Sequence, residues 1–230
     1  MDFGVIINVL GHLLIVEAGL MIPSLLVALY YGSYDWKAIL FSILITGIAG
    51  LLMSRIFKYK QSIQAKEGLA IVGFGWILAS IFGALPFIFS GTITSWIDAF
   101  FETISGFTTT GASIVDNIES FPKGILFWRS FTHWIGGMGI LVFTVALLPM
   151  FGIGGFQIYK TESPGPTPDR IVPRVRDTAK ILYTIYAIIT AIEIILLVLG
   201  GMSLYDSAIH TFGTVGTGGF GIKANSVAYY

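Results

Sequence analysis

Two short stretches rich in threonine and glycine hold the residue types best suited to binding a bare cation. The first is TTTGA (Thr108 to Ala112) and the second is GTVGTGGF (Gly213 to Phe220). Glycine reaches backbone angles closed to other residues, so consecutive carbonyl oxygens can point the same way, and threonine adds a hydroxyl oxygen. A row of such oxygens can replace the hydration shell of a cation. The chemistry expected here is ion coordination, without a covalent step.

These stretches belong to an internal repeat. Shifting the chain along itself by 108 positions aligns four identical pairs without a gap, namely Asp98 with Asp206, Thr103 with Thr211, Thr109 with Thr217 and Gly111 with Gly219. The second stretch also contains TVGTG, which is close to the TVGYG filter of potassium channels. That match would make Gly216 the central glycine, whereas the repeat makes it Gly219. We favour the register of the repeat because four ungapped identities define it.

Each loop is expected to follow a short helix that enters the membrane without crossing it. The predicted helices run from Trp96 to about Ser105 and from Asp206 to Phe212, and Thr94 or Ser95 can cap the first. A helix of ~10 residues is about 15 Å long, half the thickness of a bilayer core. Its carboxyl end carries partial negative charge and faces the loop, which favours a cation there.

The composition is that of an integral membrane protein. Of the 230 residues, 55% are hydrophobic and 11% are charged, and the mean hydropathy is +0.83. Five apolar runs reach the roughly 20 residues that a spanning helix needs; they are Phe3 to Tyr31, Trp36 to Phe57, Gly68 to Ser90, Gly124 to Leu148 and Ala179 to Met202. In hydrocarbon, non-helical chain survives only where protein or trapped water surrounds it. The predicted fold class is therefore all-α integral membrane.

Several kinds of chemistry are not expected. Cysteine is absent, which excludes disulfides, thiolate chemistry and iron–sulfur clusters. The net charge is zero, and no basic tract indicates a nucleic-acid partner. The sequence has no HExxH or GxSxG motif and no His/Asp cluster with metal spacing, so an enzyme is not expected. Membrane lipid is the expected surrounding, and no covalent cofactor is expected.

The distribution of basic residues predicts the orientation in the membrane. Nine of the 13 lysines and arginines fall in two connections, with Arg55, Lys58, Lys60 and Lys66 in the first and Lys160, Arg170, Arg174, Arg176 and Lys180 in the second. Both connections are expected to be cytoplasmic because basic residues concentrate on that side. Five alternating helices then give a multi-pass protein of the cell membrane, with a cytoplasmic N-terminus and both loops inserted from the outer side.

The chain divides into four predicted parts. Residues 1–65 form a transmembrane helical hairpin, 66–150 the first helix–pore loop–helix repeat, 151–178 a cytoplasmic linker, and 179–230 an incomplete second repeat. The linker holds four of the eight prolines, so it cannot be regular helix throughout. It is either a docking surface for a cytosolic partner or a plain surface loop.

Charged residues around the first loop allow two interpretations. Arg129 lies near the outer end of the helix that follows the loop, and His133 lies one turn further along the same face. Arg129 either braces the loop or reaches lipid headgroups. In the first case it donates to loop carbonyls or to one of three carboxylates, Glu102, Asp116 or Glu119. We expect His133 to be an interior histidine whose hydrogen bonds are satisfied.

Two carboxylates fall within apolar runs, Glu17 in the first run and Glu193 in the last. A carboxylate within a span is costly and marks either function or local pairing. If either one carries protons, the chain would be a secondary transporter that couples cation movement to protons or sodium. Parallel repeats inserted from the same side favour passive, channel-like permeation, whereas inverted repeats would favour coupling.

Longer motifs resemble the Trk/Ktr/HKT superfamily of potassium transporters and, within it, the TrkH-like membrane subunit. The motifs are ALPF (Ala84 to Phe87), DAFFETISGFTTTGA (Asp98 to Ala112), FWRSFTHWIGGMGI (Phe127 to Ile140), ESPGP, PRVRDTAK and GTVGTGGF. They are specific and extend over nearly the whole chain. Members of this superfamily resemble one another in having four helix–pore loop–helix repeats around a central pore, preceded by an extra helical pair.

The resemblance implies roles for individual residues. The implied filter residues are Thr109, Thr110, Gly111, Thr217, Gly218 and Gly219, with potassium held at Thr110, Gly111, Gly218 and Gly219. Glycine rather than serine at position 111 indicates potassium rather than sodium. Under this assignment, Arg129 and Glu102 are the residues expected to support the filter. The resemblance also implies a homodimer and a cytosolic nucleotide-binding regulatory subunit that gates uptake.

Compared with that pattern, the repeats are incomplete. Nothing after Tyr230 supplies the inner helix of the second repeat or two further loops, and two loops do not close a four-sided filter. We expect the chain to be the N-terminal portion of a longer protein. The alternative is that two copies of the chain assemble the four sides.

Overall fold

The computed structural model describes residues 2–56, 65–147 and 171–230. All regular elements in these ranges are α-helices or 3-10 helices, and no strand occurs among the described residues. The predicted all-α class is therefore confirmed. The α-helices are α1 (Phe3–Leu20), α2 (Ile22–Tyr30), α3 (Trp36–Ile56), α4 (Ala65–Gly83), α5 (Leu85–Ser90), α6 (Trp96–Phe107), α7 (Lys123–Leu147), α9 (Ile171–Leu199) and α10 (Leu204–Val215). Two short 3-10 helices are η1 (Ile118–Ser120) and η2 (Ser226–Tyr229).

Four helical segments among the described residues are long and apolar enough to cross a membrane. They are Phe3–Tyr30, Trp36–Ile56, Lys66–Ser90 and Thr178–Leu199. They coincide with four of the five apolar runs in the sequence, and the remaining run forms α7. The short helices α6 and α10, with 12 residues each, are too short to cross.

Two of the spanning segments are interrupted close to a proline. Pro23 lies in the first turn of α2, directly after the break at Met21 that ends α1. Pro86 lies in the first turn of α5, after the break at Ala84 that ends α4. Proline has no N–H and its ring collides with the carbonyl one turn earlier, so it begins a helix more readily than it continues one.

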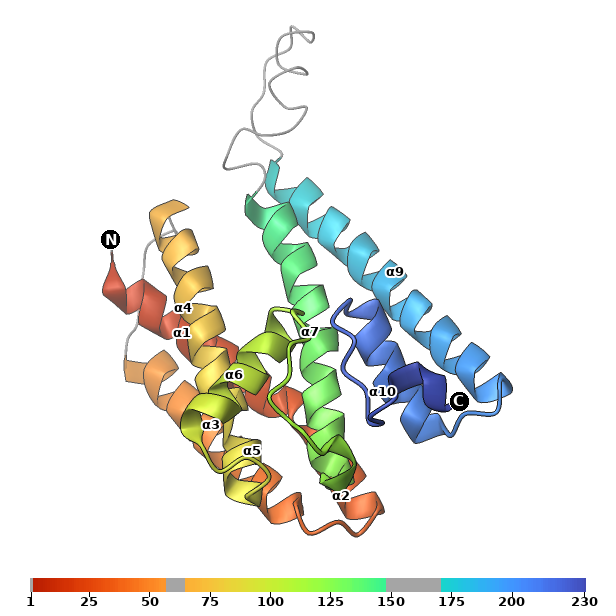
Figure 1. The fold of residues 1–230 in the computed structure, drawn as a ribbon. Coiled ribbons are helices and arrows are strands. Elements are labelled where there is room, and N and C mark those ends of the chain that lie inside the picture. The colour runs from red at the N-terminus through yellow and green to blue at the C-terminus, as the bar shows by residue number, and fades with distance from the viewer. Residues whose placement is uncertain (1, 57–64, 148–170) are drawn as a thin grey trace, which may run out of the picture.

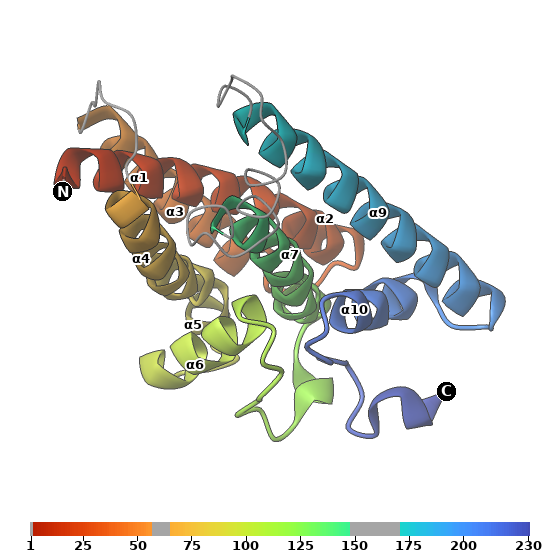
Figure 2. The same cartoon turned by 90° about the horizontal axis from the view of Figure 1, so that it is seen from above.

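Helix α7 lies in the middle of the arrangement (Figure 1). On one side are α1, α3, α4, α5 and α6, and on the other are α9 and α10, as the view from above also shows (Figure 2). Both short helices, α6 and α10, pack against α7. The two repeats are therefore joined through a single central helix. Helices α4 and α9, which open the two repeats, run in the same direction (Figure 1).

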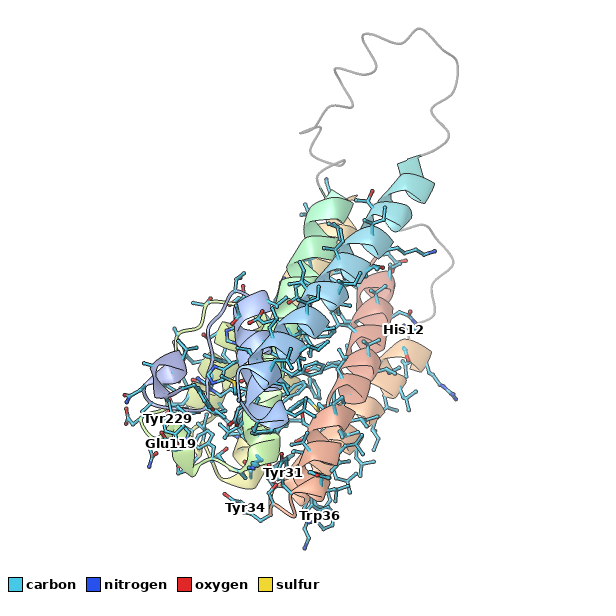
Figure 3. All side chains as sticks on the ribbon, turned by 90° about the vertical axis from the view of Figure 1, so that its right-hand side faces the viewer. His12, Tyr31, Tyr34, Trp36, Glu119 and Tyr229 are labelled. Atoms are coloured by element: carbon cyan, nitrogen blue, oxygen red, sulfur yellow. The ribbon has the colours of Figure 1, made fainter. Side chains whose placement is uncertain are left out.

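The turn between α2 and α3 fastens the beginning of α7. The buried carboxylate of Asp35 accepts hydrogen bonds from the backbone N–H of Ile125 at 2.8 Å and from the Ser33 hydroxyl at 2.5 Å. A carboxylate at a helix N-terminus satisfies an otherwise unpaired N–H group and complements the helix dipole. Tyr31, Tyr34 and Trp36 lie at this same end of the helices (Figure 3).

The second repeat begins earlier than the sequence predicts. Helix α9 starts at Ile171, inside the range 151–178 that is predicted as linker. Pro173 falls in its first turn, where a missing N–H removes no hydrogen bond within the helix. The rest of that linker lies outside the described residues, as do four of the basic residues used to predict the orientation, Lys58, Lys60, Lys160 and Arg170.

Candidate ion-binding site

The two short helices begin with the same cap at equivalent positions. The hydroxyl of Ser95 accepts a hydrogen bond from the backbone N–H of Asp98, and the hydroxyl of Ser203 accepts one from Asp206, at 3.4 and 3.1 Å. A serine cap satisfies a backbone donor that the first helical turn leaves free. The cap predicted at Thr94 or Ser95 is thus provided by Ser95. Both helices extend two or three residues beyond the predicted ends.

Each short helix is followed by a loop whose backbone alternates in handedness. Thr109 and Gly111 have φ angles of 56° and 74°, and their equivalents Thr217 and Gly219 have 63° and 84°. The residue between each pair has a negative φ. Left-handed angles are costly for threonine, so they persist only where the surrounding structure imposes them. Alternation of this kind lets successive carbonyl oxygens lie along one side of the chain.

The hydrogen bonds that hold the two loops also match. In the first loop, the N–H groups of Thr110 and Gly111 both point to the carbonyl of Ser105, at 2.9 and 3.5 Å. In the second loop, Gly218 and Gly219 both donate to the carbonyl of Gly213 at 3.0 Å. Every one of these positions is related by the 108-residue shift seen in the sequence. The two loops are therefore copies of one backbone structure.

The register of the repeat holds in the backbone. Gly216, which the potassium-channel signature would make the central glycine, caps the end of α10 with a right-handed φ of −72°. Gly219 instead has the left-handed conformation found at Gly111. The two loops touch one another, because a Cβ atom on Gly111 would overlap the carbonyl oxygen of Gly218. The carbonyl oxygen of Gly218 in the second loop thus lies against the backbone of Gly111 in the first.

Arg129 of α7 connects both loops. Its Nε donates to Oε1 of Glu102 at 2.6 Å, its Nη2 to the hydroxyl of Ser113 at 3.0 Å, and its Nη1 to the carbonyl of Gly221 at 3.3 Å. The arginine is only 4% exposed and Glu102 only 1%, which rules out an arginine that reaches lipid headgroups. Of the three carboxylates considered as partners, the structure selects Glu102 from α6.

Glu102 in turn holds the chain that leaves the first loop. Its Oε1 accepts the Ser113 hydroxyl and its Oε2 accepts the backbone N–H of Ile114, each at 3.0 Å. The hydroxyl of Ser105 donates to the carbonyl of Ala112 at 2.6 Å. The carboxylate and the hydroxyl therefore tie three consecutive residues after Gly111 back to the short helix.

Phe220 is a contact that the sequence does not indicate. It lies directly after the second loop, and the Arg129 guanidinium lies 3.5 Å from the centre of its ring. The ring of His133 meets Phe220 edge-on, with 4.0 Å between ring centres. Two residues one turn apart on α7 therefore hold the same aromatic side chain. The spacing of Arg129 and His133 predicts a shared face, but no sequence pattern points to Phe220 as the group they share.

His133 differs from expectation. It is fully buried, yet neither ring nitrogen has a hydrogen-bond partner among the described residues. The prediction of an interior position for His133 is therefore confirmed, but the prediction that its hydrogen bonds are satisfied is wrong. Its ring instead packs against Gly218 of the second loop.

Two glycines of α7 allow the short helices to approach it closely. A Cβ atom on Gly136 would overlap the carbonyl oxygen of Phe107, the last residue of α6. A Cβ atom on Gly137 would lie 3.1 Å from the Cα of Gly216, at the end of α10. The sequence leaves open whether these glycines serve packing or bending, and the structure shows close packing. The carboxyl ends of both short helices thus rest on one helix.

A profile of cation transport proteins, named TrkH, matches residues 37–230 of the chain. The chain belongs to the TrkH family. The Trk system potassium uptake protein TrkH of Escherichia coli K12 is 40% identical over 233 residues, which cover 100% of this chain and 48% of that protein. The protein of the same name from Halomonas elongata is 36% identical, with the same two coverages of 100% and 48%.

A solved structure of the TrkH family has the same fold. The crystal structure of the potassium transporter TrkH from Vibrio parahaemolyticus matches with a TM-score of 0.87 and 34% identity, covering 100% of this chain and 46% of that chain. The chain spans about half the length of the curated relatives it matches. Membership of the TrkH family and the apolar helices together identify a membrane protein.

The two carboxylates within the apolar helices of this TrkH-family chain lie in different surroundings. Glu17 is buried, and neither carboxylate oxygen has a hydrogen-bond partner among the described residues. Its Oε1 faces Gly83, which ends α4 and also contacts Thr103 and Phe107 of α6. Glu193 of α9 is half-buried and lies beside Thr214 of α10. Local pairing of Glu17 with a cation is thus absent from the part of the chain that the structure describes.

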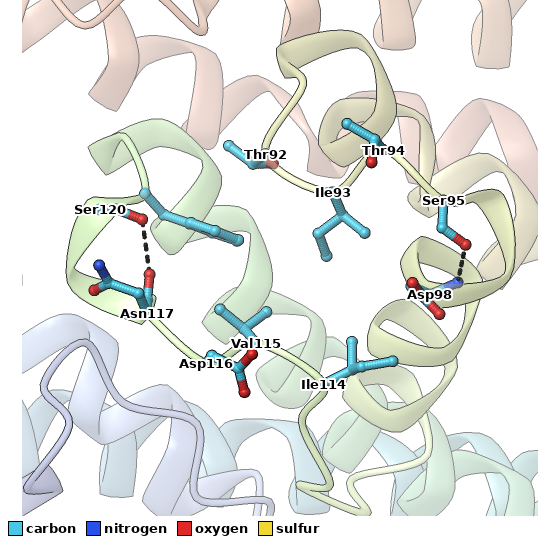
Figure 4. Close-up of a pocket in the computed structure, with 11 residues that line it drawn as sticks. Thr92, Ile93, Thr94, Ser95, Asp98, Ile114, Val115, Asp116, Asn117 and Ser120 are labelled. Atoms are coloured by element: carbon cyan, nitrogen blue, oxygen red, sulfur yellow. Dashed lines mark hydrogen bonds between the residues drawn. The ribbon is translucent and has the colours of Figure 1, made fainter.

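A shallow pocket of about 310 Å³ lies beside the first loop rather than at it. Residues before α6 and residues after the first loop line it, with the backbone of Asp98 capped by Ser95 at one side (Figure 4). Asp116 and Asn117 lie on the opposite side (Figure 4). In this TrkH-family chain the residues that line the pocket include two aspartates, Asp98 and Asp116.

A tether on this surface joins the two repeats beyond their loops. Glu119 of η1 accepts hydrogen bonds from the backbone N–H of Ala224 and from Nζ of Lys223, both at 3.3 Å. Glu119 and Tyr229, a neighbour of Lys223, lie on the same side of the molecule (Figure 3). The hydrogen bond from Ala224 and the contacts with Lys223 lower the pKa of Glu119. Since the folded pKa is depressed, the tether is present at neutral pH and is lost as the pH falls through that pKa.

Replacing Lys223 with methionine is expected to raise the pKa of Glu119 part of the way to its ordinary value, because the Ala224 hydrogen bond remains. The measurement is a carbon-13 NMR titration of the Glu119 carboxyl in detergent-solubilised protein. Lys123→Met is the matched control, since it removes an ammonium that lies over Tyr31 and Tyr205 instead. High salt should reduce the difference because the pair is exposed. An identical Glu119 titration in both variants would show that Lys223 does not act on this carboxylate.

Proposed function

We propose that this chain forms part of a pathway for potassium uptake across the cell membrane. In this pathway, backbone carbonyl oxygens of the two loops replace the hydration shell of the ion. The residues that coordinate are Thr109, Thr110, Gly111, Thr217, Gly218 and Gly219, with potassium at Thr110, Gly111, Gly218 and Gly219. Movement is passive and channel-like, and no covalent chemistry takes place.

One observation carries the proposal. Two loops with the same alternating backbone lie against each other at Gly111 and Gly218. Each follows the carboxyl end of a short helix, where partial negative charge favours a cation. Non-helical backbone within a membrane is sustained only where protein or water surrounds it, which is the setting of an ion pathway.

Potassium is the proposed ion for two reasons. The relatives from Escherichia coli and Halomonas elongata are named as potassium uptake proteins. Position 111 is glycine rather than serine, which the resemblance to the Trk/Ktr/HKT superfamily associates with potassium rather than sodium. Arg129 and Glu102 are the proposed supports of the filter, because their buried ion pair holds both the first loop and the chain that follows the second.

The proposed assembly includes further partners. We propose a homodimer in the lipid bilayer, with the N-terminus in the cytoplasm and a cytosolic nucleotide-binding subunit that regulates opening. The relatives belong to a named Trk system, which supports the idea of more than one component. Coupled transport through Glu17 or Glu193 is not favoured, because the helices α4 and α9 that begin the repeats run in parallel (Figure 1).

The test is rubidium and potassium flux into proteoliposomes that contain the full natural gene product. We expect rubidium to enter down its electrochemical gradient when the membrane potential is clamped, whether or not a pH gradient is present. An excess of external potassium should compete with rubidium, and an equal excess of sodium should compete far less. Absence of flux, or flux that follows the pH gradient at constant membrane potential, would contradict the proposal.

A further inference from the structure

We infer that His133 sets the position of the second loop, and with it the ion preference of the pathway, by filling the space that any side chain at position 218 would need. This inference rests on the proposed function, in which Gly218 supplies a carbonyl ligand. It assigns a positioning role to His133 of α7, whose ring packs against the second loop at Gly218.

The first step is the reason for glycine at position 218. A Cβ atom on Gly218 would overlap Cδ2 and Nε2 of the His133 ring. The φ angle of Gly218 is negative, so the left-handed conformation that disfavours alanine does not occur there. At Gly219 the situation is reversed, because φ is +84° and no atom of the described residues lies within 4 Å of the position that a Cβ would take. Glycine is thus required at 218 for space and at 219 for conformation.

The second step is the contrast with the first loop. The equivalent of Gly218 under the 108-residue shift is Thr110. Its hydroxyl forms a hydrogen bond with the hydroxyl of Thr108 at 2.8 Å, so the first loop accommodates a side chain at this position. The two loops have the same backbone conformation but differ in the residues that pack against them. We attribute this asymmetry to His133.

The third step is that His133 cannot easily move away. Its ring is fully buried and edge-on to Phe220, which the Arg129 guanidinium also contacts. Its backbone carbonyl oxygen lies 2.6 Å from the position of a Cβ on Gly216, so the helix itself is pressed against the end of α10. Buried packing of this kind transmits a change in volume rather than absorbing it. The ring therefore acts on the loop through its shape.

The experiment is a suppression test in the full natural gene product. We expect Gly218→Ala to lower rubidium uptake by at least tenfold per inserted protein, and His133→Ala in the same chain to restore most of that loss. His133→Ala alone should change the preference for potassium over sodium while the protein still inserts normally, since removal of the ring releases the loop. The matched control combines His133→Ala with Gly219→Ala, where no rescue is expected because the fault there is conformational.

Two results would overturn the inference. One is a Gly218→Ala protein that transports and discriminates like the natural protein. The other is a double variant with no recovery over Gly218→Ala, either in uptake or in membrane insertion if the single variant fails to insert. The apparent melting temperature in detergent gives a second readout, which should fall in Gly218→Ala and recover in the double variant. Recovery of the melting temperature tests the contact between His133 and position 218 without any measurement of transport. A failure of this inference can therefore be told apart from a failure of the proposed function.

Discussion

Gly111→Ala is expected to reduce potassium uptake by more than about tenfold. Two causes add at this position. The φ angle of +74° is strained for alanine, which alone costs about 1–3 kcal/mol. The new Cβ would also overlap the carbonyl oxygen of Gly218, so the neighbouring loop has to move. A shift of that oxygen changes the coordination of the ion directly under the proposed function.

The chain offers close controls for this substitution. Gly91 has nearly the same φ angle, +73°, but open space around it, so Gly91→Ala reports the strain without the collision. We expect Gly91→Ala to insert and to transport at close to the natural rate. Gly219→Ala should fall between the two, because it lies in the second loop but meets no atom. Rubidium tracer uptake, normalised to inserted protein, measures all three. Equal activity of the Gly111 and Gly91 variants would remove the first loop from the pathway.

Arg129→Gln is expected to destabilise the protein by about 3–5 kcal/mol, the range found when one partner of a buried ion pair is removed. The side chain of Glu102 is 0% exposed, so its charge would remain in the interior without a cation. The hydrogen bonds of Arg129 to Ser113 and Gly221 would be lost together. Both loops should lose their support, and uptake should fall with the stability. Thermal unfolding in detergent and rubidium uptake measure the two effects.

Two further variants separate the charge of Arg129 from its geometry. Glu102→Gln combined with Arg129→Gln removes the unpaired charge and should recover part of the stability. It should not recover the uptake, because the hydrogen bonds from Arg129 to Ser113 and Gly221 remain lost. Arg129→Lys keeps the positive charge but has no planar fork for three partners, so we expect an intermediate loss. Normal uptake and stability in Arg129→Gln would mean that the pair does not support the loops.

These effects converge on α7 because it contacts the short helices of both repeats. One face of the helix carries Arg129, His133, Gly136 and Gly137, and each contacts a short helix or the chain around its loop. The first loop and the second loop are therefore positioned by the same rigid element. Under the proposed function, a small displacement of α7 would move both sets of carbonyl ligands.

Much of the architecture follows from local sequence features. The apolar runs, the serine caps and the prolines at the helix breaks place most helix ends to within a few residues, because these signals act on neighbouring residues. The 108-residue repeat also gives the register of the two loops, since the threonine and glycine at equivalent positions adopt the same left-handed conformation in both. The early start of α9 is one exception. There the prolines indicate a linker, but proline is tolerated in the first turn of a helix.

The sequence by itself determined that this is a membrane protein with two equivalent threonine and glycine loops, because composition, hydropathy and repeats are properties of the chain alone. Only the tertiary structure decided which groups meet. Arg129 and Gly221 are 92 residues apart, and packing against α7 brings them within hydrogen-bonding distance. The same packing leaves His133 against Gly218 without a partner for its ring nitrogens among the described residues. A side chain's neighbours depend on how distant helices pack, and no local pattern contains that information.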